Sequence, residues 1–127
     1  ERPADRFVAD FVGRSSFING RIESPGNFIS DGGLHVACDG AAPGPATLAI
    51  RPERIALLDS NTQADNVFSG TVEFVSYLGA QLDIHVRLSP QERVVLQIPN
   101  RGETALPVVG DKVRIGWHRA TGRIFSS

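Results

Sequence analysis

The stretch that decides the fold is Gln81-Leu82-Asp83-Ile84-His85-Val86-Arg87-Leu88, in which polar and apolar residues alternate without a break. Successive side chains of a β-strand point to opposite faces of its sheet, so this alternation predicts a half-buried antiparallel strand. The apolar side chains of this strand and of the segment 112–117 are predicted to lie in the core, namely Leu82, Ile84, Val86, Val113, Ile115 and Trp117.

Segments of similar character recur on both sides of this strand, and turn-forming residues separate them. Strands are predicted at 34–38, 46–50, 54–58, 67–78, 93–98 and 112–117. Short strands at regular spacing are typical of an antiparallel barrel or sandwich. The predicted fold class is therefore all-β.

One segment near the start has helical periodicity instead. Its apolar residues recur at i, i+1, i+4 and i+5, at Phe7, Val8, Phe11 and Val12. Pro3 suits a first helical turn and Gly13 suits the residue after the last turn. We therefore predict a short linker helix over residues 1–13 and a β domain over residues 14–127.

The β domain contains a weak internal repeat. The pattern of Phe17-Ile18-Asn19-Gly20-Arg21-Ile22 returns in Val67-Phe68-Ser69-Gly70-Thr71-Val72, and residues 48–52 are echoed by residues 96–99. Glycine inside a strand marks a bulge or a bend, so two related small barrels, about 14–58 and 59–127, would each contain one. Chance similarity is one alternative. A type I′ turn at Asn19-Gly20 is another, but Gly70 has no preceding Asn, which favours a bent strand.

Composition excludes several classes of protein. The 127 residues suffice for one domain, or for two small ones sharing a core, without metals or disulfides. The single cysteine, Cys38, cannot form an intrachain disulfide and is expected to be buried. A net charge of −1 lacks the footprint of a nucleic-acid binder, and no apolar run could span a membrane. The chain begins with Glu1, contains no methionine and has no leader pattern, so we expect a piece of a larger protein.

Motifs for nucleotide binding and hydrolysis are missing from the sequence. There is no G-x-x-x-x-G-K-[ST] loop, because the sole lysine, Lys112, lies in a strand pattern, and there is no G-x-S-x-G elbow. His35, His85 and His118 are far apart and are predicted on solvated strand faces, convergence on a metal being the alternative. We predict no catalytic, cofactor-binding or metal-binding residue.

Two features leave room for a partner. The cluster Arg51-Pro52-Glu53-Arg54 is the densest in charge, and Pro52 must end or kink a strand there. It is either a solvated edge with a surface ion pair or a docking edge for another subunit. Trp117 is predicted in the core, and stacking on nucleic acid is the alternative, which the scarcity of aromatic residues disfavours.

The order of these motifs is similar to that of a known family. The matching segments are Arg2–Gly13, Phe17–Gly20, Leu48–Glu53, Asn66–Val72, Tyr77–Gly79, Pro99-Asn100 and Gly110–Val113. The chain resembles the transport-associated OB (TOBE) domain, the C-terminal regulatory segment of the ATP-binding subunits of ABC-type importers in the polyamine, iron and sugar branch. The resemblance implies an OB-like antiparallel barrel fold.

The resemblance also implies a function. The parent would be an ATPase that binds ATP and Mg²⁺ outside this segment and powers solute uptake at the cytoplasmic face of a membrane. The expected partners are a second copy in a homodimer, the ATPase domain of the same chain and the transmembrane permease subunits, with no nucleic acid. The interface implied by the resemblance includes Arg51, Pro52, Glu53, Arg54, Tyr77 and Gly79.

Two departures from the family pattern limit the resemblance. Family members usually carry Asn where Ser16 stands. Molybdate-type members have Ser-Ala-Arg-Asn where this chain has Gln63-Ala64-Asp65-Asn66, and a free carboxylate at Asp65 would repel an oxyanion, so no molybdate or tungstate site is expected. A small-solute or anion-sensing module, or an oligonucleotide-binding OB module, is the alternative function.

Overall fold

The computed structural model of the chain describes residues 15–100 and 106–126, which form ten strands and one short 3-10 helix, η1. The all-β prediction is confirmed, and the linker helix predicted over residues 1–13 lies outside the described residues. The elements are β1 (Ser16–Ser24), β2 (Asn27–Ser30), β3 (His35–Ala37), β4 (Gly44–Ile50), η1 (Pro52–Arg54), β5 (Ala56–Leu58), β6 (Asn66–Leu78), β7 (Gln81–Arg87), β8 (Arg93–Pro99), β9 (Lys112–Trp117) and β10 (Arg123–Ser126).

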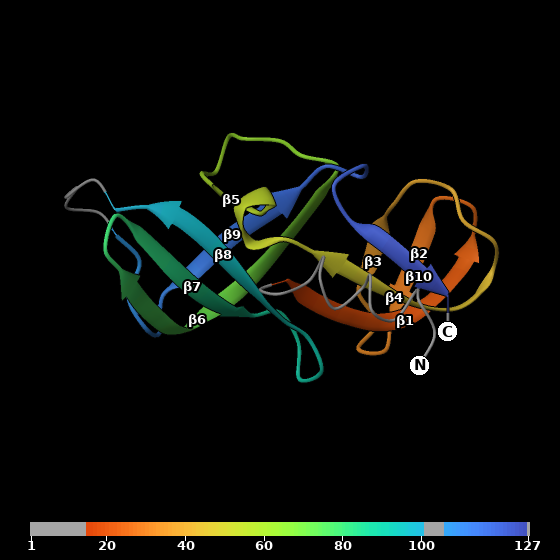
Figure 1. Ribbon diagram of the computed structural model, residues 1–127, viewed down its shortest axis with the longest axis horizontal. Coiled ribbons are helices and arrows are strands. Elements are labelled where there is room, and N and C mark those ends of the chain that lie inside the picture. The colour runs from red at the N-terminus through yellow and green to blue at the C-terminus, as the bar shows by residue number, and fades with distance from the viewer. Residues whose placement is uncertain (1–14, 101–105, 127) are drawn as a thin grey trace.

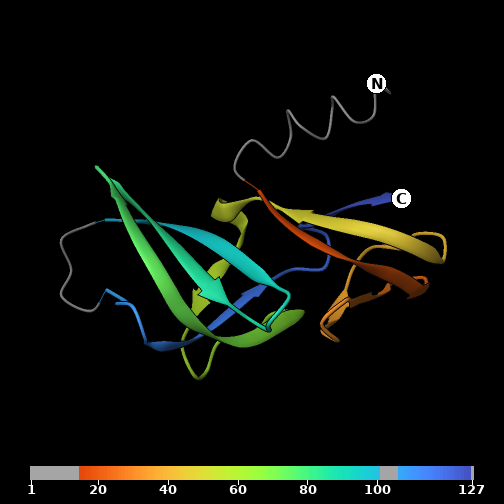
Figure 2. The same ribbon diagram turned by 90° about the horizontal axis from the view of Figure 1, so that it is seen from below.

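The strands form two five-stranded antiparallel sheets. Sheet A has the order β10-β4-β1-β2-β3 and sheet B has the order β5-β9-β6-β7-β8. Figure 1 shows the sheets side by side along the long axis, with η1 between them. In the turned view of Figure 2 the β6–β7 hairpin projects away from sheet A. The turn of this hairpin is therefore at the end of the molecule opposite sheet A.

The two sheets repeat one another strand by strand, with one exchange. Strands β1 to β4 of sheet A take the places that β6 to β9 take in sheet B. The fifth strands are exchanged, because β5 pairs with β9 in sheet B and β10 pairs with β4 in sheet A. Each sequence half, 14–58 and 59–127, thus contributes four strands to one sheet and its fifth strand to the other.

The pairing register tests the repeat predicted from the sequence. Ser16 pairs with Ile50 at one end of β1–β4, and Asn66 pairs with Trp117 at the same end of β6–β9. The two similar segments begin at the next residues, Phe17 and Val67. The similarity of residues 17–22 to residues 67–72 therefore falls on equivalent positions of equivalent strands. The second similarity, between residues 48–52 and 96–99, is wrong as a structural correspondence, since the counterpart of β4 is β9 and not β8.

The two strand glycines allow close packing within each sheet. Strand β1 runs without interruption through Gly20, so the type I′ turn does not form. A Cβ atom at Gly20 would clash with the carbonyl oxygen of Ile29, and one at Gly70 would lie 2.7 Å from the carbonyl oxygen of Arg87. Only glycine permits these approaches of one backbone to another. The pairing register runs without a shift through both glycines, so neither marks a bulge.

Most predicted strands are confirmed, and three regions differ. The prediction of a strand from Arg54 to Leu58 is partly wrong, because Pro52 opens a 3-10 turn and only Ala56–Leu58 is a strand. Strands β2 and β10 were not predicted, since each has only four residues and lies beside turn-forming residues.

The core is continuous across both sheets. Five of the six predicted core side chains are buried, and the sixth, Val113, is partly buried against them. Cys38 is buried, as predicted. The core residues are Ile18, Ile22, Phe28, Val36, Cys38, Ala46, Leu48, Ile50, Ile55, Val72, Leu82, Ile84, Val86, Val94, Leu96, Ile115 and Trp117.

Candidate functional site

Two crossovers carry the chain between the sheets, and the predicted interface cluster is one of them. Residues 51–55 connect β4 to β5, and residues 118–122 connect β9 to β10. Because Ile50 and Trp117 are equivalent, Arg51 corresponds to His118 and Pro52 to Arg119. We call the residues around the first crossover, with the start of β1, the first junction. Those around the second crossover, with the start of β6, form the second junction.

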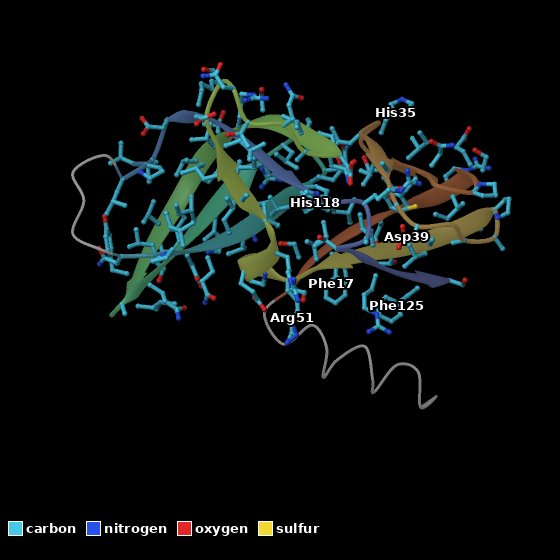
Figure 3. All side chains as sticks on the ribbon, turned by 90° about the horizontal axis from the view of Figure 1, so that it is seen from above. Phe17, His35, Asp39, Arg51, His118 and Phe125 are labelled. Carbon is cyan, nitrogen blue, oxygen red and sulfur yellow. The ribbon has the colours of Figure 1, made fainter. Side chains whose placement is uncertain are left out.

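The first crossover is held by its proline. Pro52 is buried, and η1 packs against β8. Glu53 and Arg54 are exposed, and Arg51 Nε lies 3.4 Å from Glu53 Oε2. Figure 3 shows Arg51 projecting to the same side of the molecule as Phe17 and Phe125. The cluster thus combines a packed proline with an exposed ion pair.

At the second junction, Asn66 fastens sheet B to the edge of sheet A. Its Oδ1 accepts a hydrogen bond from Ala37 N (2.7 Å), and its Nδ2 donates one to Ala37 O (2.9 Å). Asn66 is 3% exposed, so neither bond competes with bulk water. These bonds satisfy both backbone groups of Ala37, which lies in the edge strand β3 of sheet A.

The same junction contains an ionic network centred on Arg119. Asp65 Oδ2 accepts a hydrogen bond from Arg119 N (2.9 Å), and Arg119 Nη2 donates to Cys38 O (2.9 Å). Arg119 Nε also lies 3.7 Å from Asp39 Oδ1. The Asp65 carboxylate, expected to be free, is therefore engaged by the second crossover.

At the first junction, serines stand at the counterparts of Asp65 and Asn66. Ser16 Oγ accepts a hydrogen bond from Val95 N in β8, the edge strand of sheet B (2.9 Å). Ser15 Oγ is buried and has no hydrogen-bond partner among the described residues. Pro52, the counterpart of Arg119, has no N–H to offer it. Among the described residues, Ser16 thus makes one hydrogen bond across the first junction where Asn66 makes two across the second.

A further contact joins the β2–β3 and β7–β8 turns. The carboxylate of Glu92 is 3% exposed, and its Oε2 accepts a hydrogen bond from Gly32 N (2.9 Å). Its Oε1 accepts a hydrogen bond from the hydroxyl of Ser89. A Cβ atom at Gly32 would clash with this carboxylate, so a larger residue there would displace the Glu92 side chain.

The other predicted interface residues lie at the far end of sheet B, at the β6–β7 turn, and not beside the first crossover (Figure 1). Gly79 adopts φ +69° in that turn, and Tyr77 is 63% exposed. Gly110 N and Val72 O form a hydrogen bond (2.8 Å) that places the 108–111 turn along β6. We call the exposed apolar side chains here the sheet B tip; they are Phe74, Tyr77, Leu78, Val108 and Val109.

The histidines do not converge. Among the described residues, no group of three or more His, Cys, Asp or Glu could hold a metal ion. His118 lies near Asp65, with 3.7 Å between Nδ1 and Oδ2, and His85 stacks edge-on against Phe74. Burial, and secondarily Arg93, lowers the pKa of His85, while burial raises the pKa of the Cys38 thiol.

Sequence reasoning missed several of the residues that join the sheets, above all Arg119 and Glu92. The hydrogen bond from Arg119 to Cys38 O spans 81 residues of sequence, and the one from Gly32 N to Glu92 spans 60. No local sequence pattern could therefore predict either contact. Asn66 lies in one of the segments that resemble the TOBE family, which was the one available signal. Within residues 15–100 and 106–126, no helix has the length and apolar character needed to cross a membrane.

The paired sheets and their exchanged strands define a tandem OB-type β module. The model of the TOBE domain family matches residues 48–125. The chain therefore belongs to the TOBE domain family, which confirms the resemblance.

Relatives place this family in ABC importers. The spermidine/putrescine import ATP-binding protein PotA of Mesorhizobium japonicum is 33% identical over 91% of this chain. PotA 1 of Pseudomonas aeruginosa is 37% identical over 79% of it, and the Fe(3+) ions import ATP-binding protein FbpC of Brucella abortus is 38% identical over 68%. The matched regions cover 33%, 29% and 25% of those proteins, respectively.

A solved structure shares the fold. The cytoplasmic molybdate-binding protein ModG, crystallised with molybdate bound, superposes with a TM-score of 0.75 at 12% sequence identity. The match covers 88% of this chain and 96% of that one. At this identity the likeness concerns the fold alone.

Proposed function

We propose that this chain is the regulatory and self-association domain of the ATP-binding subunit of an ABC-type importer of a small solute. Family membership and relatives named as import ATP-binding proteins support this proposal. The ATPase domain of the same chain would bind ATP and Mg²⁺, and this domain would add no catalytic step. The subunit would act with permease subunits at the cytoplasmic face of a membrane.

The observation that carries the self-association is the sheet B tip. Phe74 is 56% exposed, and Tyr77 and Val109 are both more than 60% exposed. Phe74 and Leu78 lie on one face of β6 and Tyr77 on the other, because side chains alternate along a strand. Several exposed apolar side chains at one end of a sheet, on both of its faces, favour an interaction surface there. In an isologous dimer, both copies of each of these side chains would be buried in the interface.

The first crossover is the second candidate for the contact. Glu53 and Arg54 are exposed there, and Arg51 pairs with Glu53. Exposed ion pairs contribute little, about 0–1 kcal/mol, so we propose that the apolar side chains of the sheet B tip provide the binding energy. Tyr77 is the most exposed of them, and Gly79 permits the turn that presents it. Arg51, Glu53 and Arg54 would then supply selectivity at the rim, on a backbone that Pro52 fixes.

Sedimentation equilibrium of the 127-residue chain tests the proposal. We expect a concentration-dependent dimer that Tyr77→Asp weakens at least tenfold, because the change places a charge in an apolar contact. Asn19→Asp, an exposed change on sheet A, is the control. A wild-type chain that stays monomeric at high concentration would contradict self-association of this domain. A dimer sensitive to Glu53→Arg and not to Tyr77→Asp would move the contact to the first crossover.

The oligonucleotide-binding alternative has a direct test. Fluorescence anisotropy with a labelled single-stranded oligonucleotide should show no saturable binding at physiological salt, because the net charge is −1. Saturable binding would favour the oligonucleotide-binding OB module over the regulatory domain.

A further inference from the structure

Sheet A carries apolar side chains on its outer face, where β10, β4 and β1 lie side by side. Phe17 of β1 pairs with Ala49 of β4, and Phe125 of β10 pairs with β4 two residues before Ala49. Ile18 and Leu48 lie in the core, so their neighbours Phe17 and Ala49 point away from it. Figure 3 shows Phe17 and Phe125 on the same side of the molecule. We call Phe17, Ala49 and Phe125 the outer patch of sheet A.

The outer patch is covered at its centre. Ala49 is 0% exposed, although it faces away from the core and is not a member of the core cluster of the described residues. Its cross-strand neighbours, Phe17 and Arg123, are both exposed. Water reaches a methyl group on the outer face of an antiparallel sheet unless another group lies over it. The burial of Ala49 therefore indicates a further layer over β4 on this side.

Residues 1–14 are the part of the chain next to this patch, because they lead directly into β1. They lie outside the described residues, but their sequence predicts a helix. Apolar residues three or four positions apart would share one face of this helix, namely Ala4, Phe7, Val8, Phe11 and Val12. Charged residues four positions apart would share the opposite face, namely Arg2, Arg6 and Asp10. The sequence thus provides an amphipathic segment beside an apolar sheet face.

The dimensions of such a helix fit the patch. A helix over residues 4–12 would be about 13 Å long, because each residue adds about 1.5 Å. Strands β10 and β1 lie on either side of β4, and neighbouring strands are about 5 Å apart, so the patch is about 10 Å wide. Phe17 is the second residue of β1, so only a few residues separate the predicted helix from the patch. The apolar face of the helix is therefore long enough to cover all three strands.

We propose that residues 4–12 of this chain dock as an amphipathic helix on the outer patch of sheet A. The apolar face of the helix packs over Ala49 and against the rings of Phe17 and Phe125, and its charged face points to solvent. Removing these apolar surfaces from water stabilises the docked helix. This docking involves one chain only and does not rest on the proposed function.

One consequence for the parent subunit does rest on the proposed function. The segment through which the ATPase domain would lead into this domain is held on sheet A, whereas the turn of the β6–β7 hairpin projects away from sheet A (Figure 2). The two ends of the domain would then contact different partners. Sheet A would contact the segment from the ATPase domain of the same chain, and the sheet B tip would contact a second copy.

The test is NMR of the 127-residue chain with labelled alanine methyl groups and a neutral, soluble paramagnetic agent. The agent speeds the relaxation of methyl groups that solvent reaches, so we expect slow relaxation at Ala49 in the wild type. Phe11→Asp should speed the relaxation of Ala49 several-fold, because a charge in the apolar face undocks the helix. Arg6→Asp places the same side chain on the opposite face and is the matched control, in which Ala49 should stay protected. A nuclear Overhauser effect should also join the Ala49 methyl to the ring of Phe7 or Phe11.

Several results would overturn the proposal. They are fast relaxation of Ala49 in the wild type, continued protection of Ala49 in Phe11→Asp, or equal effects of Phe11→Asp and Arg6→Asp. A nuclear Overhauser effect that arises only between labelled and unlabelled chains would assign the patch to a second copy instead. The signal of the buried Trp117 indole reports whether each variant folds, and the wild-type measurements decide the matter if Phe11→Asp does not. A monomeric chain in which Ala49 is protected and contacts Phe7 or Phe11 would contradict self-association and support the docking, which separates the two proposals.

Discussion

At the start of β6, Asn66 bonds both backbone groups of Ala37. At the start of β1, Ser16 bonds the N–H of Val95 and no other group among residues 15–100 and 106–126. The two positions are equivalent in register, so the comparison isolates the side chains. A carboxamide carries a donor and an acceptor in one plane and can satisfy both backbone groups of a residue. A hydroxyl at the end of a shorter side chain makes one bond here.

The two crossovers also differ in their hydrogen bonds, and the second crossover again makes more of them. Arg119 has a backbone N–H that Asp65 accepts and a side chain that reaches Cys38 O. Pro52 has neither, and it contributes a fixed backbone and a buried ring. The second junction is therefore a polar lock. The first is packed around the buried ring of Pro52. The same arrangement of strands thus forms two junctions with different polar contacts, because a few residues at the strand ends differ.

The largest effect should come from the core that both junctions share. Ile84 is fully buried in β7, and Ile84→Ala should lower the free energy of unfolding by about 2–5 kcal/mol. Chemical denaturation measures it. A loss below about half a kcal/mol would mean that the core closes around the gap and that the alternation in β7 matters less than we infer.

The next effect should come from breaking the polar lock. Asn66→Ala leaves the N–H and C=O of Ala37 unpaired at a buried site, and we expect a loss of about 2–4 kcal/mol. Asn66→Asp is the companion variant, because it keeps the acceptor for Ala37 N and loses the donor to Ala37 O. Equal stability of Asn66→Ala and the wild type would show that the junction contributes nothing.

The matching change at the first junction should be milder. Ser16→Ala removes one hydrogen bond, and Ser16 lines an open hollow of about 380 Å³ from which water can reach Val95 N, so the expected loss is about 0.5–1.5 kcal/mol. The same denaturation series measures it. If Ser16→Ala proved as damaging as Asn66→Ala, the asymmetry of the two junctions would be refuted.

The strands and the core could be predicted from the sequence, whereas the contacts at the junctions could not. Alternation in β7 and β9 predicts both strands and nearly all of their buried side chains, because period-two patterns depend on neighbouring residues only. The exchange of β5 and β10 depends on pairing partners distant in the chain, and these strands have only three and four residues. The predicted interface residues fall into two separate places, and no local pattern distinguishes a crossover from a docking edge.

The smallest effect concerns the dependence of stability on pH that the partly buried His85 produces. Because the folded state lowers the pKa of His85, the unfolded chain binds more protons as the pH falls through about 6.5. Stability should therefore decrease between pH 7.5 and pH 5.5, and His85→Gln should remove part of that decrease. His35→Gln, an exposed histidine on sheet A, is the control. An unchanged pH slope in His85→Gln would argue against a pKa of His85 that burial lowers in the folded state.

Native-state hydrogen exchange at two amides tests the asymmetry of the junctions most directly. Ala37 N donates to Asn66 Oδ1 and Val95 N donates to Ser16 Oγ, so each amide reports on one junction. We expect a larger protection factor for Ala37 than for Val95, and we expect Asn66→Ala to accelerate exchange at Ala37 far more than at Val95. Equal protection of the two amides, or slower exchange at Val95, would show that the two junctions are not asymmetric in this way.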